Sequence, residues 1–455
     1  MIRVHARLSS GRRLDKLQAD VLGAMDEALQ TANPASIIRR HVRLDHDTLR
    51  VDKLSFPLKR DQRLFVFGAG KASGYMAEEI ERILGERIDD GFVIIPDYLR
   101  PRPRGHRIRY HLGTHPIPSR KNTDGAAQIL RLVKNSTAND LIVVILSGGA
   151  SALMDYPLEG ISLEDERKTT SLLLRSGTNI HEINTVRRHI SRVKGGRLAE
   201  AAHGARVLTL IISDVVGDQI DTIGSGPTAP DPTTYSDAKQ VLEKYSLWMR
   251  IPSHVRKTIM TGINGVLAET PKQGDRAFRY VNNVIVGCNR ESCRAAASYL
   301  NKEGYHSQVL STRIVGEARE AGRILGSVAT DIHDNGLPIS PPAALTSGGE
   351  TTVTVKGNGK GGRNQELALA AAASIAGYER IVVGSIATDG VDGQTDAAGA
   401  IADGTTVKRG KRLGMDAEDY LRKNDSYNYF RRLGDLIMTG PTGTNVNDIM
   451  IIVAK

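Results

Sequence analysis

Cysteine is scarce in this chain of 455 residues, which contains only Cys288 and Cys293. Two cysteines cannot build a disulfide framework. A structural zinc site of the CxxC type is also excluded, because the paired CxxC motifs that form such a site are missing. This cysteine usage is typical of a protein from a reducing compartment.

Aromatic residues are also few, at 4% of the chain. Proteins that bind single-stranded nucleic acid stack the bases on aromatic side chains, so the low content disfavours that class. The chain is nevertheless basic, because its 61 Lys and Arg residues outnumber its 51 Asp and Glu residues and give a net charge of +10. This charge favours an anionic partner, and phosphate metabolites and nucleic acids both meet that description.

Long hydrophobic runs are missing as well. No run of about 18 apolar residues occurs, so we expect no membrane-spanning helix and no membrane partner. The first residues, MIRVHARLSSGRRLDK, are charged and lack the apolar segment of a secretory signal. We therefore expect a cytoplasmic protein. The 40% of hydrophobic residues is enough to build cores, which excludes disorder as the main state.

Short apolar runs that end at a glycine or polar loop and precede a helical pattern recur along the chain. They lie at 63–67, 141–146, 207–212, 283–286 and 381–386. Continuous apolar runs predict strands buried on both faces, and their alternation with helices predicts parallel sheets. We therefore expect an α/β protein. Ligands bind such sheets beyond the carboxyl ends of the strands, where the glycine-rich loops of this chain lie.

The predicted domain boundary falls in the polar, turn-rich stretch 269–275. It separates a larger N-terminal domain over 1–275, with a Rossmann-like α/β/α architecture, from a smaller C-terminal α/β domain over 276–455. The last apolar run, 449–453, could join either sheet.

The first glycine-rich loop has the sequence GAGKAS, from Gly68 to Ser73, between a predicted strand and a predicted helix. Helix N-termini offer unpaired N–H groups to an anion, and Lys71 adds a positive charge there. The spacing matches neither a Walker A loop nor GxGxxG. A purely structural strand-to-helix turn is the alternative.

Two further segments of the N-terminal half carry polar groups. In SGGAS, Ser147, Gly148 and Gly149 offer a hydroxyl and backbone N–H groups, without matching the GxSxG motif of serine hydrolases. The segment 184–197 is densely basic, and helical spacing would place positions 187, 191 and 194 on one face. Such a face could bind a carboxylate or phosphate, although an ordinary solvated helix has the same pattern.

Carboxylates follow two of the predicted strands. Asp214 comes directly after the run 207–212, where it could hold Mg²⁺ or activate a hydroxyl, or simply cap a helix. Asp389 and Asp392 lie in the turn TDGVDG after the run 381–386 and could hold Mg²⁺ or a ribose. His111 and His115 are four residues apart, but Gly113 and Pro116 argue against a helix that would present both to a metal.

The loop GNGKGGRN satisfies GxGxxG at Gly357, Gly359 and Gly362. The dinucleotide fingerprint is incomplete, because no clear acidic strand end follows about 20 residues later. Lys360 and Arg363 favour a phosphate ligand over a nicotinamide cofactor.

Taken together, these loops supply lysine, arginine, glycine N–H groups and aspartates at strand ends in both halves of the chain. Phosphoryl transfer requires this set of groups, because it depends on positioning and on charge neutralisation by Lys, Arg and Mg²⁺. Two domains that face a cleft would also exclude water by closing.

Several longer segments make the sequence similar to one family. They are GAGKAS, GTHPIPS, SGGASAL, INTVRRHISRVKGGRLA, LIISDVVGDQIDTIGSGPTAPDPTT, GKGGRNQELAL, ATDGVDGQTDAAGA and TGPTGTNVNDI. In this order the chain resembles the glycerate 2-kinase family, the two-domain type with a C-terminal MOFRL domain. The resemblance implies two α/β domains with a cleft between them. It also implies ATP-dependent phosphorylation of D-glycerate at its 2-hydroxyl, giving 2-phosphoglycerate, with Mg²⁺.

The resemblance also suggests roles for individual residues. Lys71, Arg363 and Asp214 would act in catalysis, Lys71 on the transferring phosphoryl group and Arg363 on a phosphate or the glycerate carboxylate. The residues expected to bind substrate are Ser147, Gly148, Gly149, Asn184, Arg187 and Lys194. Those expected to bind the nucleotide are Gly359, Lys360, Gly361, Gly362, Asp389 and Asp392. Asp214 and Asp389 are the candidates for holding Mg²⁺.

Other functions remain open at this point. A hydroxypyruvate reductase would need the nicotinamide fingerprint that is incomplete here, and a kinase of another small hydroxy acid would need a changed pocket. A nucleic-acid module is suggested by charge alone, so we expect no nucleic-acid partner. A homodimer is compatible with the sequence. Two features depart from the family pattern: Ala150 replaces a glycine, and the segment 100–109 contains five arginines.

Overall fold

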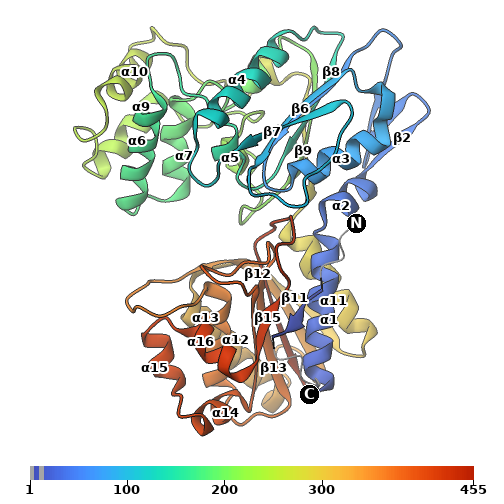
Figure 1. Cartoon of the computed structure of the whole chain (residues 1–455), viewed down its shortest axis with the longest axis vertical. Helices are drawn as coiled ribbons and strands as arrows, with labels where there is room; N and C mark the ends of the chain where they lie inside the picture. Colours follow the sequence, from blue (N-terminus) through green and yellow to red (C-terminus); the bar gives the residue numbers. More distant parts are fainter. Residues whose placement is uncertain (1–4, 10–14) are drawn as a thin grey trace. The chain divides into compact units, whose positions relative to one another are not determined.

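The computed structural model describes residues 5–9 and 15–455. Contacts divide the chain into two compact units: unit 2 is Ile37–Val286, and unit 1 joins the described residues up to Ser36 to Gly287–Lys455 (Figure 1). Each unit has its own sheet and hydrophobic cores, as predicted for a two-domain α/β protein. The division differs from the predicted boundary at 275/276 in two ways. The N-terminal helix packs within unit 1, and the strand Val281–Gly287 joins the sheet of unit 2.

Unit 2 contains a six-stranded sheet in the order β10-β9-β8-β5-β6-β7. Its strands are β5 (Leu64–Ala69), β6 (Asp90–Pro96), β7 (Ile108–Gly113), β8 (Leu141–Leu146), β9 (Arg206–Ile212) and β10 (Val281–Gly287). From β9 to β7 all neighbouring strands pair in parallel, which confirms the parallel sheet. Every residue of the central strand β8 is buried, as its unbroken apolar sequence predicts.

The remaining elements of unit 2 connect or extend this sheet. A three-stranded antiparallel sheet is formed by β2 (Val42–Asp45), β3 (Thr48–Val51) and β4 (Leu54–Pro57). The helices are α2 (Pro34–His41, which crosses the unit boundary), α3 (Ser73–Leu84), α4 (Arg120–Lys134), α5 (Ala150–Leu153), α6 (Leu163–Arg175), α7 (Ile180–His189), α8 (Arg197–Glu200), α9 (Tyr235–Lys244) and α10 (Ser253–Ile263). Helices α6, α7, α9 and α10 contribute to a hydrophobic core of their own.

Unit 1 contains a seven-stranded mixed sheet in the order β1-β15-β14-β13-β16-β12-β11. Its strands are β1 (Arg7–Leu8), β11 (His306–Glu317), β12 (Ala343–Thr352), β13 (Ile381–Ala387), β14 (Gly399–Asp403), β15 (Leu436–Met438) and β16 (Asp448–Ala454). The C-terminal strand β16 lies between β13 and β12 and therefore does not join the sheet of unit 2.

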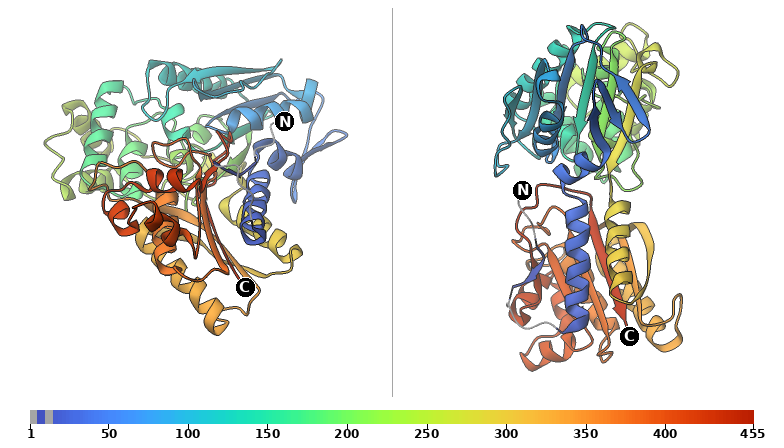
Figure 2. Two further views of the ribbon diagram at one scale, coloured as in Figure 1. Left: turned by 60° about the horizontal axis from the view of Figure 1, so that its bottom comes forward. Right: turned by 90° about the vertical axis from the view of Figure 1, so that its right-hand side faces the viewer.

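The unbroken apolar runs of β13 and β16 pair antiparallel, which differs from the parallel arrangement predicted for such runs. Both strands are nevertheless buried on both faces, because one core lies on each side of the sheet. Helices α1 (Lys16–Thr31) and α11 (Asn289–Lys302) cover one face, and α12 (Ala318–Asn335) and α13 (Arg363–Ser374) cover the other (Figure 2). Burial alone produced the apolar pattern, whatever the strand direction. The short helices α14 (Thr406–Arg412), α15 (Ala417–Arg422) and α16 (Ser426–Leu433) complete a third core.

Helix α1 belongs to unit 1 because its apolar face lies directly on β13. Val21, Met25 and Ala28 are fully buried, and a Cβ built at Gly384 of β13 would come within 2.6 Å of Met25 Cε. Asp15 begins the helix by accepting a hydrogen bond from the backbone N–H of Gln18 at 2.8 Å.

We therefore expect Met25→Ala to lower the free energy of unfolding of unit 1 by about 2–5 kcal/mol, because it opens a cavity between α1 and β13. Chemical denaturation followed by circular dichroism measures this loss. Glu27→Ala, on the exposed face of the same helix, is the matched control and should change stability little. Equal effects of the two variants would contradict the packing of α1 on unit 1.

Candidate functional site

The candidate site of unit 2 lies where β5, β8 and β9 reach the same edge of the parallel sheet. The loop Gly68–Ser73 follows β5, the loop Ser147–Ala150 follows β8, and Asp214 follows β9. The register pairs Ala69 with Leu146, and Leu146 with Ile211, so the three loops start at the same level. The structure thus brings together three segments that the sequence analysis had singled out separately.

Ser147 joins the first two loops. Its hydroxyl accepts a hydrogen bond from the backbone N–H of Ala72 at 3.0 Å and lies 2.9 Å from the Ser73 hydroxyl. The Lys71 N–H donates to the Gly148 carbonyl at 2.8 Å. Gly70 has a φ of +146°, and a Cβ there would lie 2.1 Å from the Ser147 oxygen, so this close approach requires glycine. Ser147 is 1% exposed, so its hydroxyl organises the loops, whereas the sequence analysis predicted that it lines the substrate pocket.

His115 lies beside Lys71 and Gly149. A Cβ at Gly149, where φ is +83°, would come within 2.9 Å of the His115 ring and 3.4 Å of Lys71 Cγ. Burial, and then the positive charge of Lys71, lower the pKa of His115 to about 4. Its ring is therefore neutral at physiological pH, and its Nδ1 lies 3.3 Å from the Tyr98 hydroxyl.

Sequence reasoning missed this residue because it considered His115 only as a metal ligand paired with His111. The imidazole of His111 instead lies 2.7 Å from the Lys121 carbonyl. The sequence signal that could have identified His115 was its place in GTHPIPS, one of the segments that carry the family resemblance.

Asp214 approaches the SGGAS loop from β9. A Cβ at Gly148 would lie 2.2 Å from Asp214 Oδ2, so no other residue fits at position 148 without a shift. The carboxylate, Lys71 and His115 thus all lie around the same two glycines. Ala150, which replaces a family glycine, is buried at 1% exposure, and a Cβ built at Gly224 would lie 3.2 Å from its methyl group.

Asn184 and Arg187 lie behind this loop on α7. The Asn184 amide oxygen accepts a hydrogen bond from the Ser225 hydroxyl at 3.0 Å, and that hydroxyl lies 2.6 Å from the Ser151 hydroxyl. Arg187 Nη2 donates to the Ser151 carbonyl at 3.0 Å. Asn184 is 2% exposed, so its contacts support the loop from behind, and the predicted direct contact with substrate has no exposed amide to make it.

Lys194 is fully buried, whereas the sequence analysis predicted from its charge that it binds substrate. Its ammonium forms a hydrogen-bonded ion pair with Asp155 and lies 3.4 Å from Glu166 Oε1. Burial, and then the neighbouring Asp155 carboxylate, raise the pKa of Glu166 to about 8. Asp155 Oδ2 and Glu166 Oε2 are buried without a hydrogen-bond partner in the described part of the chain.

The predicted basic helix face at positions 187, 191 and 194 does not exist. Helix α7 ends at His189, so Ser191 and Lys194 lie outside it. Arg188 is the cation that α7 does place in a network, because it is bonded to Asp231 at 3.0 Å and to the Asp221 carboxylate at 2.9 Å. This network fixes both ends of the segment 221–231, which carries GSGPTAP.

The arginine-rich segment 100–109 is bound to its own unit. The Glu81 carboxylate accepts hydrogen bonds from the backbone N–H groups of His106 at 2.6 Å and Arg107 at 2.9 Å. Arg109 forms an ion pair with Asp90 at 2.9 Å. These contacts are those of a surface loop held to its own unit.

In unit 1, Arg363 is the first residue of α13 and lies against the start of β16. Its Nε and Nη2 donate to the two Asp448 oxygens at 2.6 and 2.9 Å, and its Nη1 lies 3.1 Å from Glu350. Asp448 is fully buried because it pairs with Gly349 on one side and Ala387 on the other. Burial raises the pKa of Asp448 to about 6, although Arg363 opposes this shift. The three contacts use three of the five N–H donors of the guanidinium.

Asp392 caps helix α13, whereas the sequence analysis predicted that it binds the nucleotide. Its carboxylate accepts hydrogen bonds from the backbone N–H groups of Asn364 at 3.0 Å and Gln365 at 2.9 Å. Asp392 is 1% exposed, and burial raises its pKa to about 6. A carboxylate in this position stabilises the positive end of the helix dipole.

The glycine-rich loop before α13 packs against the turn 423–425. The backbone N–H of Gly359 donates to the Lys423 carbonyl and that of Lys360 to Asp425, both at 2.9 Å, while Gly357 donates to the Asn424 side chain. These amides are therefore engaged within the protein and are not directed at a phosphate. The Lys360 ammonium lies 4.3 Å from the centre of the Tyr427 ring.

Gly361 and Gly362 at the end of the loop, and Asp389 after β13, complete this part of the site. A Cβ at Gly362 would lie 2.3 Å from the Asp392 carboxyl carbon, so this glycine allows the cap to form. A Cβ at Gly361 would lie 2.3 Å from the Ser426 hydroxyl. Asp389 is half-buried, and its Oδ1 accepts a hydrogen bond from the Val391 N–H at 3.1 Å.

Two features are absent from the described residues, 5–9 and 15–455. No three or more His, Cys, Asp or Glu side chains gather there as a group that could hold a metal ion. No helix in the same residues has the length and apolar character needed to span a membrane.

The fold and the two candidate sites define an α/β protein of two units whose strand-end loops collect cations and carboxylates. Comparisons with known proteins agree with this class. Residues 20–260 match the family described as "Domain of unknown function (DUF4147)", and residues 343–448 match the MOFRL family.

Relatives extend the match over nearly the whole chain. The glycerate 2-kinase of Pyrococcus horikoshii is 43% identical over 433 residues, covering 95% of this chain and 96% of its own. The crystal structure of glycerate kinase from Thermotoga maritima superposes with a TM-score of 0.85 at 39% identity, covering 96% of this chain and 99% of its own. A putative hydroxypyruvate reductase of Agrobacterium vitis is 38% identical and covers 88% of this chain and 89% of its own. The chain belongs to the glycerate kinase family with a C-terminal MOFRL domain.

Proposed function

We propose that this protein is a glycerate 2-kinase, which transfers the terminal phosphoryl group of ATP to the 2-hydroxyl of D-glycerate and releases 2-phosphoglycerate and ADP. The observation that carries the proposal is the arrangement of Lys71, His115 and Asp214 around Gly148 and Gly149. A cation, a neutral imidazole and a carboxylate beside glycine N–H groups suit a small hydroxy acid and a phosphoryl group.

The proposal gives each group a distinct task. Lys71 stabilises the negative charge on the transferring phosphoryl oxygens. The neutral His115 ring forms a hydrogen bond to glycerate without adding charge. Asp214 orients the 2-hydroxyl and receives its proton as the oxygen attacks phosphorus.

Arg187 supports the glycine loop through the Ser151 carbonyl. The proposal assigns the N–H groups of Gly148 and Gly149 to the glycerate carboxylate. Ser147 and Asn184 act indirectly by holding these loops, as their burial requires.

In unit 1, the proposal assigns Arg363 to an anionic group of the nucleotide or of glycerate. Asp448 fixes the guanidinium in one orientation, and the donors that Asp448 and Glu350 leave unused can bind phosphate oxygens. The half-buried Asp389 supplies a carboxylate on the nucleotide side.

Mg²⁺ accompanies ATP in the proposed reaction. This ion needs one or two protein carboxylates, because phosphate oxygens and water complete its octahedral shell. Asp214 and Asp389 fit this requirement, since each is a carboxylate beside a glycine, and the missing side chain of Gly148 leaves space at Asp214 Oδ2. Asp214 or Asp389 would hold the ion, which would neutralise charge on the phosphate oxygens.

An assay that identifies the product tests the proposal. We expect the protein, supplied with ATP, Mg²⁺ and D-glycerate, to feed enolase directly without added phosphoglycerate mutase, because enolase accepts 2-phosphoglycerate and not the 3-isomer. A signal that appears only after mutase is added would show transfer to the 3-hydroxyl. No ATP consumption in the presence of glycerate would contradict a kinase altogether.

A hydroxypyruvate reductase is the alternative, because relatives in Agrobacterium carry that name. It would need a dinucleotide site, and the amides of the GxGxxG loop are instead bonded to the turn 423–425. We therefore expect no loss of NADH or NADPH absorbance with hydroxypyruvate. Turnover of either cofactor would favour the reductase.

A further inference from the structure

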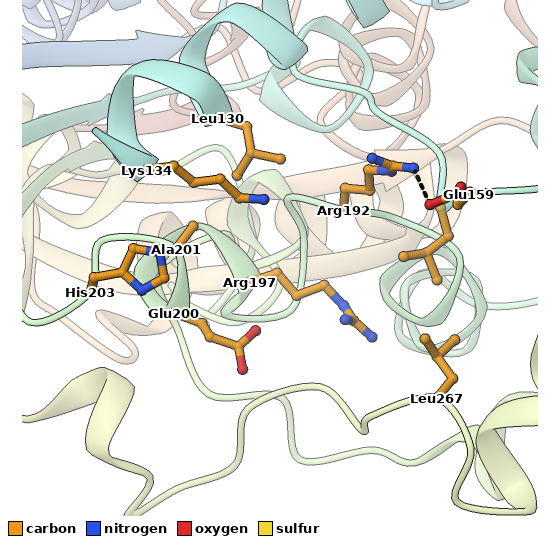
Figure 3. Close-up of a pocket in the computed structure, with 10 residues that line it drawn as sticks. Leu130, Lys134, Glu159, Arg192, Arg197, Glu200, Ala201, His203 and Leu267 are labelled. Carbon is orange, nitrogen blue, oxygen red and sulfur yellow. Dashed lines mark hydrogen bonds and ion pairs between the residues drawn. The ribbon is translucent and has the colours of Figure 1, made fainter. Parts of the chain in front are cut away.

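Unit 2 contains a hollow that the proposed reaction does not use. It has a volume of about 560 Å³ and is lined by Leu130, Lys134, Leu158, Glu159, Arg192, Arg197, Glu200, Ala201, His203 and Leu267 (Figure 3). We name it the basic hollow. Its volume lies within the range of sites that bind small organic molecules.

The basic hollow lies toward the other end of the parallel sheet from the strand-end loops. Lys134 is the last residue of α4, seven residues before β8 begins at Leu141, and His203 precedes β9, which begins at Arg206. The hollow therefore lies toward the amino ends of these strands, whereas Lys71 and Asp214 follow carboxyl ends. A ligand in the hollow would not occupy the site proposed for glycerate.

Cations enter the hollow from three segments of the chain. Figure 3 shows Lys134 from α4, Arg192 from the segment before α8, and Arg197 from α8 itself around one open space. The Lys134 ammonium forms no hydrogen bond or ion pair with the side chains or backbone of the other described residues. Arg197 Nη2 donates to the Tyr235 hydroxyl at 3.0 Å, but its Nε is buried without a partner in the described chain.

The carboxylates of the hollow balance this charge only in part. Glu159 lies 3.5 Å from Arg192, but its side chain is 94% exposed, and ion pairs of that kind contribute little. Glu200 is also exposed. Three cations, Lys134, Arg192 and Arg197, therefore face two carboxylates.

The floor of the hollow is apolar. Leu130 and Ala201 are each 7% exposed, and Leu158 and Leu267 are partly buried beside them. An inorganic ion would leave these side chains uncovered, whereas a ligand with a carbon skeleton would bury them. The apolar floor and the excess of cations together favour an amphipathic anion as the ligand.

We propose that the basic hollow is a binding site for a small organic anion, whose phosphate or carboxylate group contacts Lys134, Arg192 and Arg197 while its apolar body covers Leu130, Leu158 and Leu267. The proposal does not depend on the reaction that the protein catalyses. The expected ligand carries one dianionic or monoanionic group joined to a flat or aliphatic body.

Titration of the full chain with phenyl phosphate, followed by calorimetry, tests this site. We expect Lys134→Glu to weaken binding by about tenfold or more, because it replaces a charge-assisted hydrogen bond by repulsion. Lys134 is exposed, so this variant should fold normally, and an unchanged melting temperature checks that. Lys53→Glu, in the turn between β3 and β4, carries the same charge change at another exposed position and should bind as the unchanged protein does.

Two further titrations locate the site and identify the ligand class. Lys71→Ala should retain the binding that Lys134→Glu loses, which separates the hollow from the proposed active site. Inorganic phosphate and benzyl alcohol should each bind more weakly than phenyl phosphate, because each supplies half of the contacts. Unchanged binding in Lys134→Glu would overturn the site, and equal affinity for inorganic phosphate would overturn the role of the apolar floor.

Discussion

Lys71→Ala is expected to lower kcat for glycerate phosphorylation by about a thousandfold, with a smaller change in KM. A positive charge placed on a transferring phosphoryl group contributes about 10³–10⁵ in rate, and this contribution is made in the transition state. Lys71 is half-buried and lies beside Gly149, so its side chain can be shortened without opening a core. Steady-state kinetics with the enolase-coupled assay measure both constants.

A second measurement tests the position of the Lys71 charge independently of turnover. The Lys71 charge is one of the two causes that lower the pKa of His115, the other and larger being burial. In Lys71→Ala the pKa of His115 should therefore rise from about 4 toward its ordinary value without reaching it. NMR titration of the ring checks this.

The matched control is Lys59→Ala, which removes an exposed lysine before β5 and should leave both turnover and the His115 pKa unchanged. A loss of less than tenfold in Lys71→Ala, with His115 shifted as expected, would show that Lys71 is correctly placed but does not act on the phosphoryl group.

The sequence predicted the parts of this site that depend on local pattern. The unbroken apolar run of β8 indicated a central strand, and the glycines after it indicated a loop at a strand end, where Ser147 and Gly148 do lie. Asp214 was placed correctly for the same reason, since it follows the apolar run of β9. Parallel strands gather such loops at one edge whatever lies between them in the chain.

The contacts that the sequence could not predict depend on partners distant in sequence. Lys194 looks like one more exposed cation until Asp155, 39 residues earlier, and Glu166 are found around it. Asp392 looks like a metal ligand until α13, whose first turn lies 28 residues before it, places two N–H groups on its carboxylate. Periodicity and spacing do not reveal such contacts between distant residues, so charge alone suggested a ligand in both cases.

The buried cluster of Asp155, Glu166 and Lys194 leads to the second large effect. Lys194→Met is expected to lower the free energy of unfolding by about 3–5 kcal/mol, because it leaves the Asp155 carboxylate buried without its cation. Lys168→Met, an exposed lysine on α6, is the matched control and should have little effect. Chemical denaturation measures both, and similar stabilities would contradict the cluster.

The same cluster makes stability depend on pH. Glu166 has a pKa of about 8 in the folded protein and an ordinary value of 4.5 when unfolded, so the folded state holds an extra proton between these values. Stability must then fall as pH rises through this window, by up to about 1.4 kcal/mol per pH unit. Glu166→Gln keeps the neutral shape and cannot lose the proton.

The difference in unfolding free energy between Glu166→Gln and the unchanged protein isolates this effect from all other titrating groups. It should grow in favour of the variant by about 2–3 kcal/mol between pH 6 and pH 8 and level off above pH 8, where the folded protein has lost the proton. Denaturation curves at several pH values measure it. A difference that stays constant would mean that Glu166 is already ionised in the folded state, with Lys194 stabilising both carboxylates at once. Asp155 and Glu166 would then form a structural ion cluster with no bound proton.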